Sequence, residues 1–203
     1  MRRRADRARL VLALVLACPA LATLAQPTAA QRERFTSQCL ACHGPQGVSS
    51  LPLTPSLAGQ HSFYAITQLF LFREGRRDNP VMLEQAKGMS DADLQAFADL
   101  IAQLPPPSNT TTMHAPVDGA RSARGQALAQ RLNCFGCHGA DLAGGKQVAR
   151  LARQREDYLL HTLQGFRAGT RVGYTSAMSE ALAGTTPQQL EDLAHFLAHA
   201  AGP

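Results

Sequence analysis

The chain has 203 residues, a formal charge of +5 and 45% hydrophobic residues, with five cysteines and no tryptophan. Residues 1–25 contain five Arg and one Asp, so removal of that segment would leave 15 basic and 14 acidic side chains. A balance so close to neutrality does not predict a nucleic-acid partner. The four cysteines beyond residue 25 could form two disulfides, but a disulfide framework does not explain why a histidine follows each second cysteine.

Residues 1–25 are predicted to be a signal peptide. A basic start, M-R-R-R-A-D-R-A-R, precedes an apolar run from Leu10 to Leu24 that is too short to span a bilayer. Small residues allow cleavage after Ala25 or Ala30, and we favour Ala25. The pattern predicts export to the periplasm, with tethering through an uncleaved segment or a lipidated Cys18 as the alternative.

The remainder of the chain contains one unit twice. C-L-A-C-H-G, which begins at Cys39, recurs as C-F-G-C-H-G from Cys134, and the sequence that follows each motif aligns at offsets of 94 to 96. Proline and small polar residues separate the copies and are typical of a semi-rigid spacer. We therefore predict a first domain at 26–104, a linker at 105–120 and a second domain at 121–203.

Helical periodicity is found throughout both copies. The segment 61–74 and its repeat from Tyr158 have helical spacing, and each copy ends with a capped amphipathic helix that follows Ser90 or Thr186. No alternating strand pattern is found. Each copy is predicted to be an all-α domain of three or four helices, which seals only a modest core unless something else fills it.

The Cys-x-x-Cys-His motif predicts a covalently attached haem. In a helical turn Cys39, Cys42 and His43 lie on one face, so two thiols can form thioethers while the imidazole reaches the iron. The same argument assigns thioethers to Cys134 and Cys137, and the proximal ligand to His138.

Two other uses of paired cysteines fit less well. Zinc ribbons bring their cysteine pairs within roughly 15 to 20 residues, whereas these pairs lie 95 residues apart. Redox Cys-x-x-Cys chemistry is typical of a βαβ context, which this sequence lacks. We therefore predict two haem c groups, one in each repeat.

A methionine is predicted to fill the sixth iron position in each copy. Met82 in N-P-V-M and Met178 in T-S-A-M are 43 and 44 residues after the first cysteine of their motifs. Met89 aligns with Thr185, so we interpret it as a packing residue that covers Leu94. Surface or packing roles are expected for the four histidines on helical stretches outside the motifs, which are His61, His161, His195 and His199.

Together these motifs resemble those of the dihaem class I cytochromes c, and most closely those of cytochrome c4. The resemblance covers nearly all of the chain beyond residue 25. It implies two tandem class I cytochrome c domains, each wrapped around its haem and related by a pseudo-two-fold axis. In this class a proline carbonyl commonly contacts the proximal histidine, which implies this role for Pro55.

The second copy has Ala149 in place of that proline, and L-A-R-Q in place of L-A-G-Q, although a backbone carbonyl could still serve there. Four arginines recur in both copies, and we interpret them as surface charge at helix ends, with contact to haem propionates as the alternative. They are Arg73, Arg77, Arg167 and Arg171.

The leading functional hypothesis is a periplasmic carrier of single electrons, because His/Met ligation closes both irons to substrates. The resemblance implies a terminal oxidase as acceptor, and a quinol-oxidising complex is a further candidate partner. One alternative is the cytochrome subunit of a periplasmic dehydrogenase such as a flavocytochrome. The other is a dihaem enzyme, such as a peroxidase or a thiosulfate-oxidising cytochrome, which would need one open iron.

Overall fold

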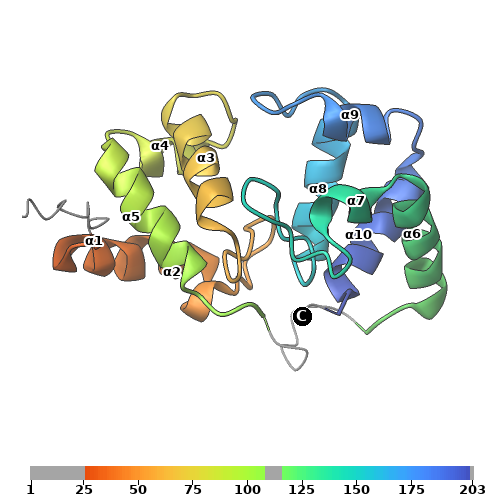
Figure 1. Ribbon diagram of the computed structural model, residues 1–203, viewed down its shortest axis with the longest axis horizontal. Helices are drawn as coiled ribbons and strands as arrows, with labels where there is room; N and C mark the ends of the chain where they lie inside the picture. Colours follow the sequence, from red (N-terminus) through yellow and green to blue (C-terminus); the bar gives the residue numbers. More distant parts are fainter. Residues whose placement is uncertain (1–25, 108–115, 202–203) are drawn as a thin grey trace, which may run out of the picture.

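The computed structural model describes residues 26–107 and 116–201. The predictions for the signal peptide and for Cys18 lie outside this part of the chain. Within it the protein is helical, and its one β-bridge, between Gly145 and Val148, is isolated. Two helical halves lie side by side along the long axis of the molecule (Figure 1).

Each half contains the same succession of helices. The first half consists of α1 (Ala29–Arg34), the π-helical turn η1 (Phe35–Cys39), α2 (Leu40–His43), the short turn η2 (Pro45–Gly47), α3 (Ser62–Arg73), α4 (Pro80–Ala86) and α5 (Asp91–Ala102). The second half consists of α6 (Gly119–Arg131), α7 (Cys134–His138), α8 (Glu156–Arg167), α9 (Ala177–Leu182) and α10 (Pro187–His199). Helices α3 and α8 keep the repeat offset of 94, as the sequence alignment predicted.

The last helix of each half carries the predicted cap. Ser90 and Asp93 form a reciprocal capping box at α5, and Thr186 and Gln189 form one at α10, where Pro187 occupies the first turn. Helix α6 begins at Gly119, two residues before the expected start of the second repeat. The reason is local, because the Asp118 carboxylate accepts hydrogen bonds from the first free backbone amides of α6.

A separate hydrophobic core lies inside each half. In the first half α3 packs on α5, and in the second half α10 packs on both α6 and α8. Met89 belongs to the first core with Leu94 and is only 6% exposed, as expected of a packing residue. Among the described helices, none combines the length and the apolar character needed to cross a membrane.

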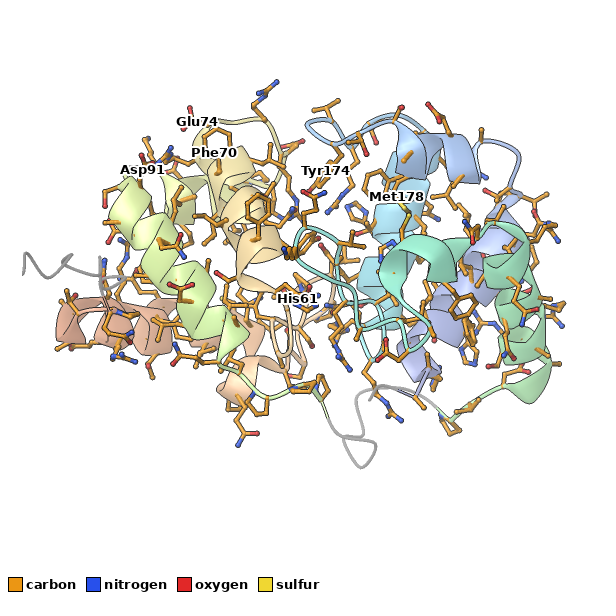
Figure 2. The ribbon with its side chains drawn as sticks, in the orientation of Figure 1. His61, Phe70, Glu74, Asp91, Tyr174 and Met178 are labelled. Atoms are coloured by element: carbon orange, nitrogen blue, oxygen red, sulfur yellow. The ribbon has the colours of Figure 1, made fainter. Side chains whose placement is uncertain are left out.

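The boundary between the halves has pseudo-two-fold symmetry. His61 in the first half donates to Ala143 O in the second, at 3.0 Å. At the repeat-related positions Arg155 donates to Ser49 O, at 3.3 Å. The two contacts are related by the repeat, because each joins the same pair of positions with the halves exchanged. Reciprocal contacts of this kind are typical of a two-fold interface. The figures agree: His61 lies between the halves in Figure 2.

Candidate haem-binding sites

His43 is buried at the end of α2 and is oriented by a backbone carbonyl. Its Nδ1 lies 2.7 Å from Pro55 O. A carbonyl oxygen can only accept, so Nδ1 carries the proton and Nε2 keeps its lone pair. Burial lowers the pKa of His43, although the hydrogen bond to Pro55 opposes this shift, so the neutral imidazole is favoured. A neutral imidazole with one free nitrogen is the form that binds a metal.

His138 has the same environment at the end of α7. Its Nδ1 donates to Ala149 O at 2.8 Å, so the second repeat supplies the carbonyl without a proline. Burial lowers the pKa of His138 as well, against the opposing effect of this hydrogen bond. The backbone geometry, and not the proline ring, therefore fixes the imidazole.

The four cysteines of the motifs are free thiols. In each motif the first cysteine is partly buried and the second is exposed. Burial raises the pKa of Cys39 to about 11, and it also raises the pKa of Cys134. Each motif thus presents two free thiols beside an imidazole whose Nε2 is not protonated, which is the donor set that covalent haem attachment requires.

The two candidate methionines lie in equivalent helices. Met82 is in the first turn of α4, where its backbone amide donates to the Asn79 cap at 3.0 Å. Met178 is in α9, and Figure 2 shows it in the second half. Each methionine is partly buried against the core of its own half, so both repeats place a thioether beside their hydrophobic core.

Two partly buried arginines lie at the boundary between the halves. Arg77 donates to Gln68 Oε1 at 2.7 Å and, across the boundary, to the Tyr158 hydroxyl at 2.8 Å. Arg171 donates to Thr162 Oγ1 at 3.5 Å and to the Tyr174 hydroxyl at 3.2 Å. None of the four partners is a carboxylate, and among the described residues no carboxylate forms an ion pair with Arg77 or Arg171.

Tyr158 responds to the positive charge of these two arginines. Burial alone would raise the pKa of Tyr158, but the Arg77 and Arg171 guanidiniums outweigh it and lower that pKa. Buried donors that lack a partner here include Arg171 Nε, Gln68 Nε2 and two nitrogens of Arg150. Buried cations normally have an anionic partner, and haem c carries two carboxylates. The polar environment at the boundary therefore fits the propionates of the group that the motifs predict.

The interpretation of the four recurring arginines as surface charge needs correction for two of them. Arg73 and Arg167 do lie at helix ends, where each donates to the carbonyl that precedes a capped helix, Met89 O and Thr185 O. Arg77 and Arg171 instead lie within the boundary. Their recurrence at an offset of 94 was visible in the sequence, but only the packing of the halves distinguishes them from their neighbours.

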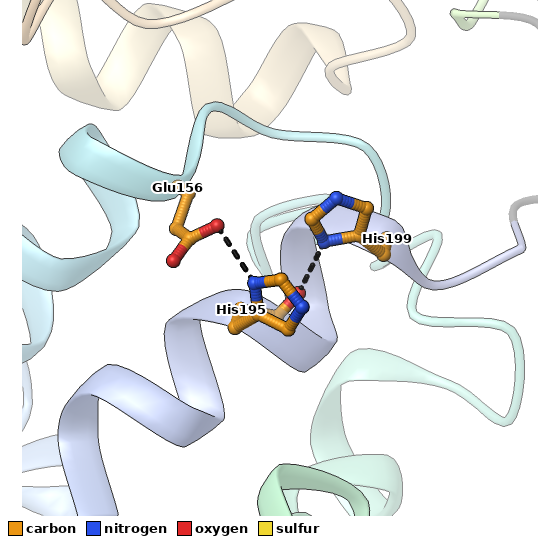
Figure 3. A group of neighbouring side chains, drawn as sticks. All are labelled: Glu156, His195 and His199. Atoms are coloured by element: carbon orange, nitrogen blue, oxygen red, sulfur yellow. Dashed lines mark hydrogen bonds and ion pairs between the residues drawn. The ribbon is translucent and has the colours of Figure 1, made fainter. Parts of the chain in front are cut away.

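A histidine cluster in the second half is best explained as a structural link. Ligand atoms of Glu156, His195 and His199 lie within 4.8 Å of one another (Figure 3). However, His195 Nε2 accepts from the Asp118 backbone amide at 3.0 Å, while Nδ1 donates to Glu156 Oε2 at 2.9 Å. Both nitrogens of this imidazole are thus engaged, which leaves no lone pair for a metal.

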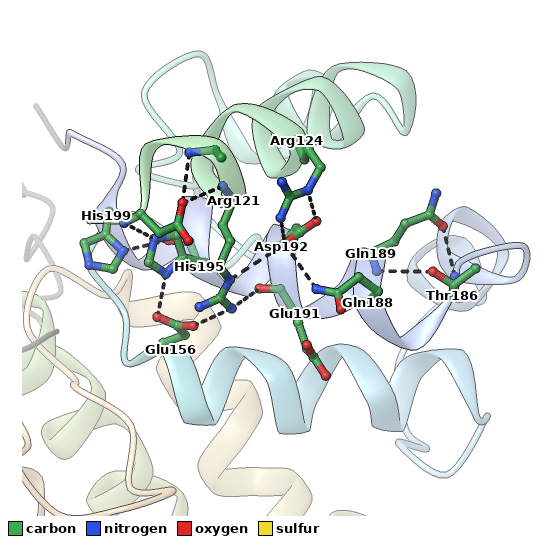
Figure 4. A network of polar contacts seen from close by, with 12 residues as sticks. Arg121, Arg124, Glu156, Thr186, Gln188, Gln189, Glu191, Asp192, His195 and His199 are labelled. Atoms are coloured by element: carbon green, nitrogen blue, oxygen red, sulfur yellow. Dashed lines mark hydrogen bonds and ion pairs between the residues drawn. The ribbon is translucent and has the colours of Figure 1, made fainter. Parts of the chain in front are cut away.

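Arginine side chains complete this link. Arg121 donates to Glu156 Oε1 at 3.0 Å, and Arg124 forms two hydrogen bonds to Asp192 at 2.6 and 3.0 Å (Figure 4). The network joins α6, α8 and α10. His195 is 2% exposed, so it is a packing residue, as predicted.

Comparisons with known proteins agree with this geometry. Residues 122–201 match the family described as cytochrome c, and residues 26–101 match cytochrome c oxidase, cbb3-type, subunit III. Cytochrome c4 from Thiocapsa roseopersicina is 33% identical over 170 residues, which are 78% of this chain and 85% of that protein. The thiosulfate dehydrogenase electron acceptor of Thiomonas intermedia is 32% identical over 92% of this chain and 86% of that protein.

Among solved structures, reduced cytochrome c4 from Pseudomonas stutzeri matches with a TM-score of 0.77 and 26% identity, over 87% of this chain and all of that chain. Two repeated motifs, two equivalent histidine environments and similarity along nearly the whole described chain lead to one assignment. The protein belongs to the cytochrome c4 family of dihaem, electron-transferring class I cytochromes c.

Proposed function

We propose that each half holds its haem through two thioethers and two axial ligands. The residues are Cys39, Cys42, His43 and Met82 in the first half, and Cys134, Cys137, His138 and Met178 in the second. The observation that carries this proposal is the repeated imidazole geometry, in which Nδ1 donates to a carbonyl and Nε2 stays free. The bound haem supplies reversible one-electron chemistry.

The proposed ligands restrict the haem chemistry to electron transfer. A thioether in the sixth position leaves no open site for a substrate, and His/Met ligation raises the reduction potential. Arg77 and Arg171 would hold propionate carboxylates at the boundary. The protein therefore acts as a carrier and not as an enzyme, with its two redox centres coupled through the boundary.

The ligand assignment is tested by substitution of each methionine. Met82→Ala removes the thioether from the first haem only, and Met178→Ala removes it from the second, so each variant converts one haem to a high-spin or newly ligated form. Met89→Leu is the matched control, because Met89 is a buried methionine of the first core and its replacement should leave both spectra unchanged. An unchanged spectrum in Met82→Ala would show that Met82 is not a ligand.

The route that we propose begins with a periplasmic donor and ends at a terminal oxidase. The predicted signal peptide supports the periplasmic location. A specific observation favours a second role, as the electron acceptor of a periplasmic dehydrogenase, because the Thiomonas relative is named as such an acceptor. The two roles are compatible, since one accepts electrons and the other delivers them.

Stopped-flow kinetics test both steps with the haem-loaded protein. The oxidised protein is mixed with thiosulfate dehydrogenase and thiosulfate, and the reduced protein with membranes that contain a terminal oxidase. Fast reduction in the first mixture and fast oxidation in the second are expected. Slow exchange in both mixtures would contradict the carrier role, whereas turnover of thiosulfate by the protein alone would indicate an enzyme.

A further inference from the structure

Gln154 of the second half forms hydrogen bonds with the backbone N–H and the backbone C=O of one residue of the first half, Ser56. Its Oε1 accepts from Ser56 N at 2.8 Å, and its Nε2 donates to Ser56 O at 2.8 Å. The contact is dry, because Ser56 is 3% exposed and Gln154 is 6% exposed. In a site shielded from water, such hydrogen bonds are electrostatically stronger than in solvent.

Gln60 of the first half makes the mirror contact. Its Oε1 accepts from Arg150 N at 3.1 Å, and its Nε2 donates to Arg150 O at 2.9 Å. Gln60 and Gln154 occupy equivalent repeat positions, as do Ser56 and Arg150, each at an offset of 94. The boundary is therefore bridged twice by the same glutamine-to-peptide bond pattern.

Each glutamine accepts a hydrogen bond from the N–H of the peptide group that orients a candidate iron ligand. Ser56 N–H and Pro55 C=O belong to a single planar peptide group, and Pro55 O accepts from His43 Nδ1. The Arg150 N–H and Ala149 C=O likewise share one group, and Ala149 O accepts from His138 Nδ1. Each glutamine is thus one peptide away from the proximal histidine of the opposite half.

Hydrogen bonds in such a chain polarise one another. An acceptor on the amide side draws the N–H dipole and leaves more negative charge on the carbonyl oxygen of the same peptide. A more negative carbonyl is a better acceptor for the imidazole N–H, and this raises the basicity of the ligating nitrogen. The glutamine also fixes where the carbonyl points, and so fixes the plane of the ring.

We propose that Gln154 is a positioning residue for His43 and that Gln60 is one for His138, each acting across the boundary through a single peptide group. Each half thereby sets the ligand strength of the other half's iron. The inference rests on the proposed histidine ligation. It goes further, because it makes the boundary a determinant of both reduction potentials.

Gln154→Met and Gln60→Met test the proposal, because methionine keeps the approximate length and volume of the side chain and loses both hydrogen bonds to the opposite half. Reduction potentials and haem-methyl NMR shifts are measured for each haem of the holoprotein. Each set of signals is assigned to its haem by the change that Met82→Ala or Met178→Ala causes. We expect Gln154→Met to raise the potential of the first haem and Gln60→Met that of the second, since a less basic imidazole stabilises ferric iron less.

His61→Leu is the matched control. It removes one hydrogen bond across the same boundary, to Ala143 O, without touching either histidine-orienting peptide. The control should lower thermal stability and leave both potentials in place. Should Gln154→Met fail to fold, Gln154→Asn keeps the amide but withdraws it by one methylene, and a smaller rise of the first potential is expected.

The possible outcomes distinguish the positioning role of the glutamines from the proposed histidine ligation. Crosswise shifts, each confined to the haem of the opposite half, support the positioning role. Equal small shifts in both haems, or shifts matched by His61→Leu, would reduce the glutamines to structural bridges and overturn the inference. If the unsubstituted protein showed no histidine ligand on its irons, that result would instead contradict the proposed function itself.

Discussion

The packing of α6 on α10 depends on Gly125, and the substitution Gly125→Ala tests this packing. A Cβ built at Gly125 would lie 2.1 Å from Asp192 O and 2.7 Å from Phe196 Cβ. The first contact is to backbone, which cannot rotate away, so α10 must move by about 1 Å to restore ordinary contact distances. Helices α6 and α10 would therefore move apart in the core of the second half.

The expected cost follows from two opposing effects. Overpacking of this kind costs up to about 3 kcal/mol, while replacing a helical glycine by alanine gains about 1 kcal/mol. The net loss of about 2 kcal/mol corresponds to a fall in Tm of roughly 8–16 °C for a domain of this size. Thermal unfolding of the holoprotein, followed by circular dichroism, measures the change.

Gly119→Ala is the control on the same helix, because nothing lies within 4 Å of a Cβ built there. It should be neutral or slightly stabilising. A Gly125→Ala variant as stable as this control would refute the packing argument, because it would show that α6 and α10 do not meet at Gly125.

Three further predictions concern the boundary and the caps. The pKa of Asp157 is lowered because hydrogen bonds from Arg155 and the Leu53 amide outweigh the effect of burial. The ionised carboxylate therefore stabilises the folded protein at pH values above the ordinary aspartate pKa. This stabilisation is lost as the pH falls through the lowered pKa of the folded state. Asp157→Asn should accordingly reduce stability at pH 7 and converge with the parent protein in acid, and a constant difference in urea titrations would contradict this. Thr186→Ala should cost about 1 kcal/mol, with Thr186→Ser restoring most of it in the same titrations. Arg171→Gln removes a partly buried positive charge and should lower at least one reduction potential in potentiometric titration, whereas unchanged potentials would indicate that Arg171 does not contact a propionate.

The sequence predicted the repeated parts of the molecule well, because each signal appears twice. The offset of 94 to 96 predicted equivalent helices, and the helix caps at Ser90 and Thr186 are where the pattern placed them. The resemblance also directed attention to the carbonyl of Pro55, which lies within hydrogen-bond distance of His43. The ligand roles themselves remain predictions that the substitutions above test.

The boundary was not predictable in the same way. Gln60 and Gln154 recur at the repeat offset, but nothing in a single sequence says which surface of one copy meets the other. Arg77 and Arg73 are four residues apart near one helix end, and only the packing of the halves shows that Arg77 contacts the opposite half while Arg73 does not. Contacts between repeats depend on three-dimensional docking, which leaves no periodic signal.

The most direct test of the account is a haem count per chain combined with electron paramagnetic resonance and optical spectra of the oxidised and reduced holoprotein. The account predicts two haems per chain, both low-spin, each with one imidazole and one thioether ligand. A chain with one haem, or with one iron that is high-spin or binds added ligands in the unsubstituted protein, would contradict the carrier function and would identify the half whose methionine is not a ligand.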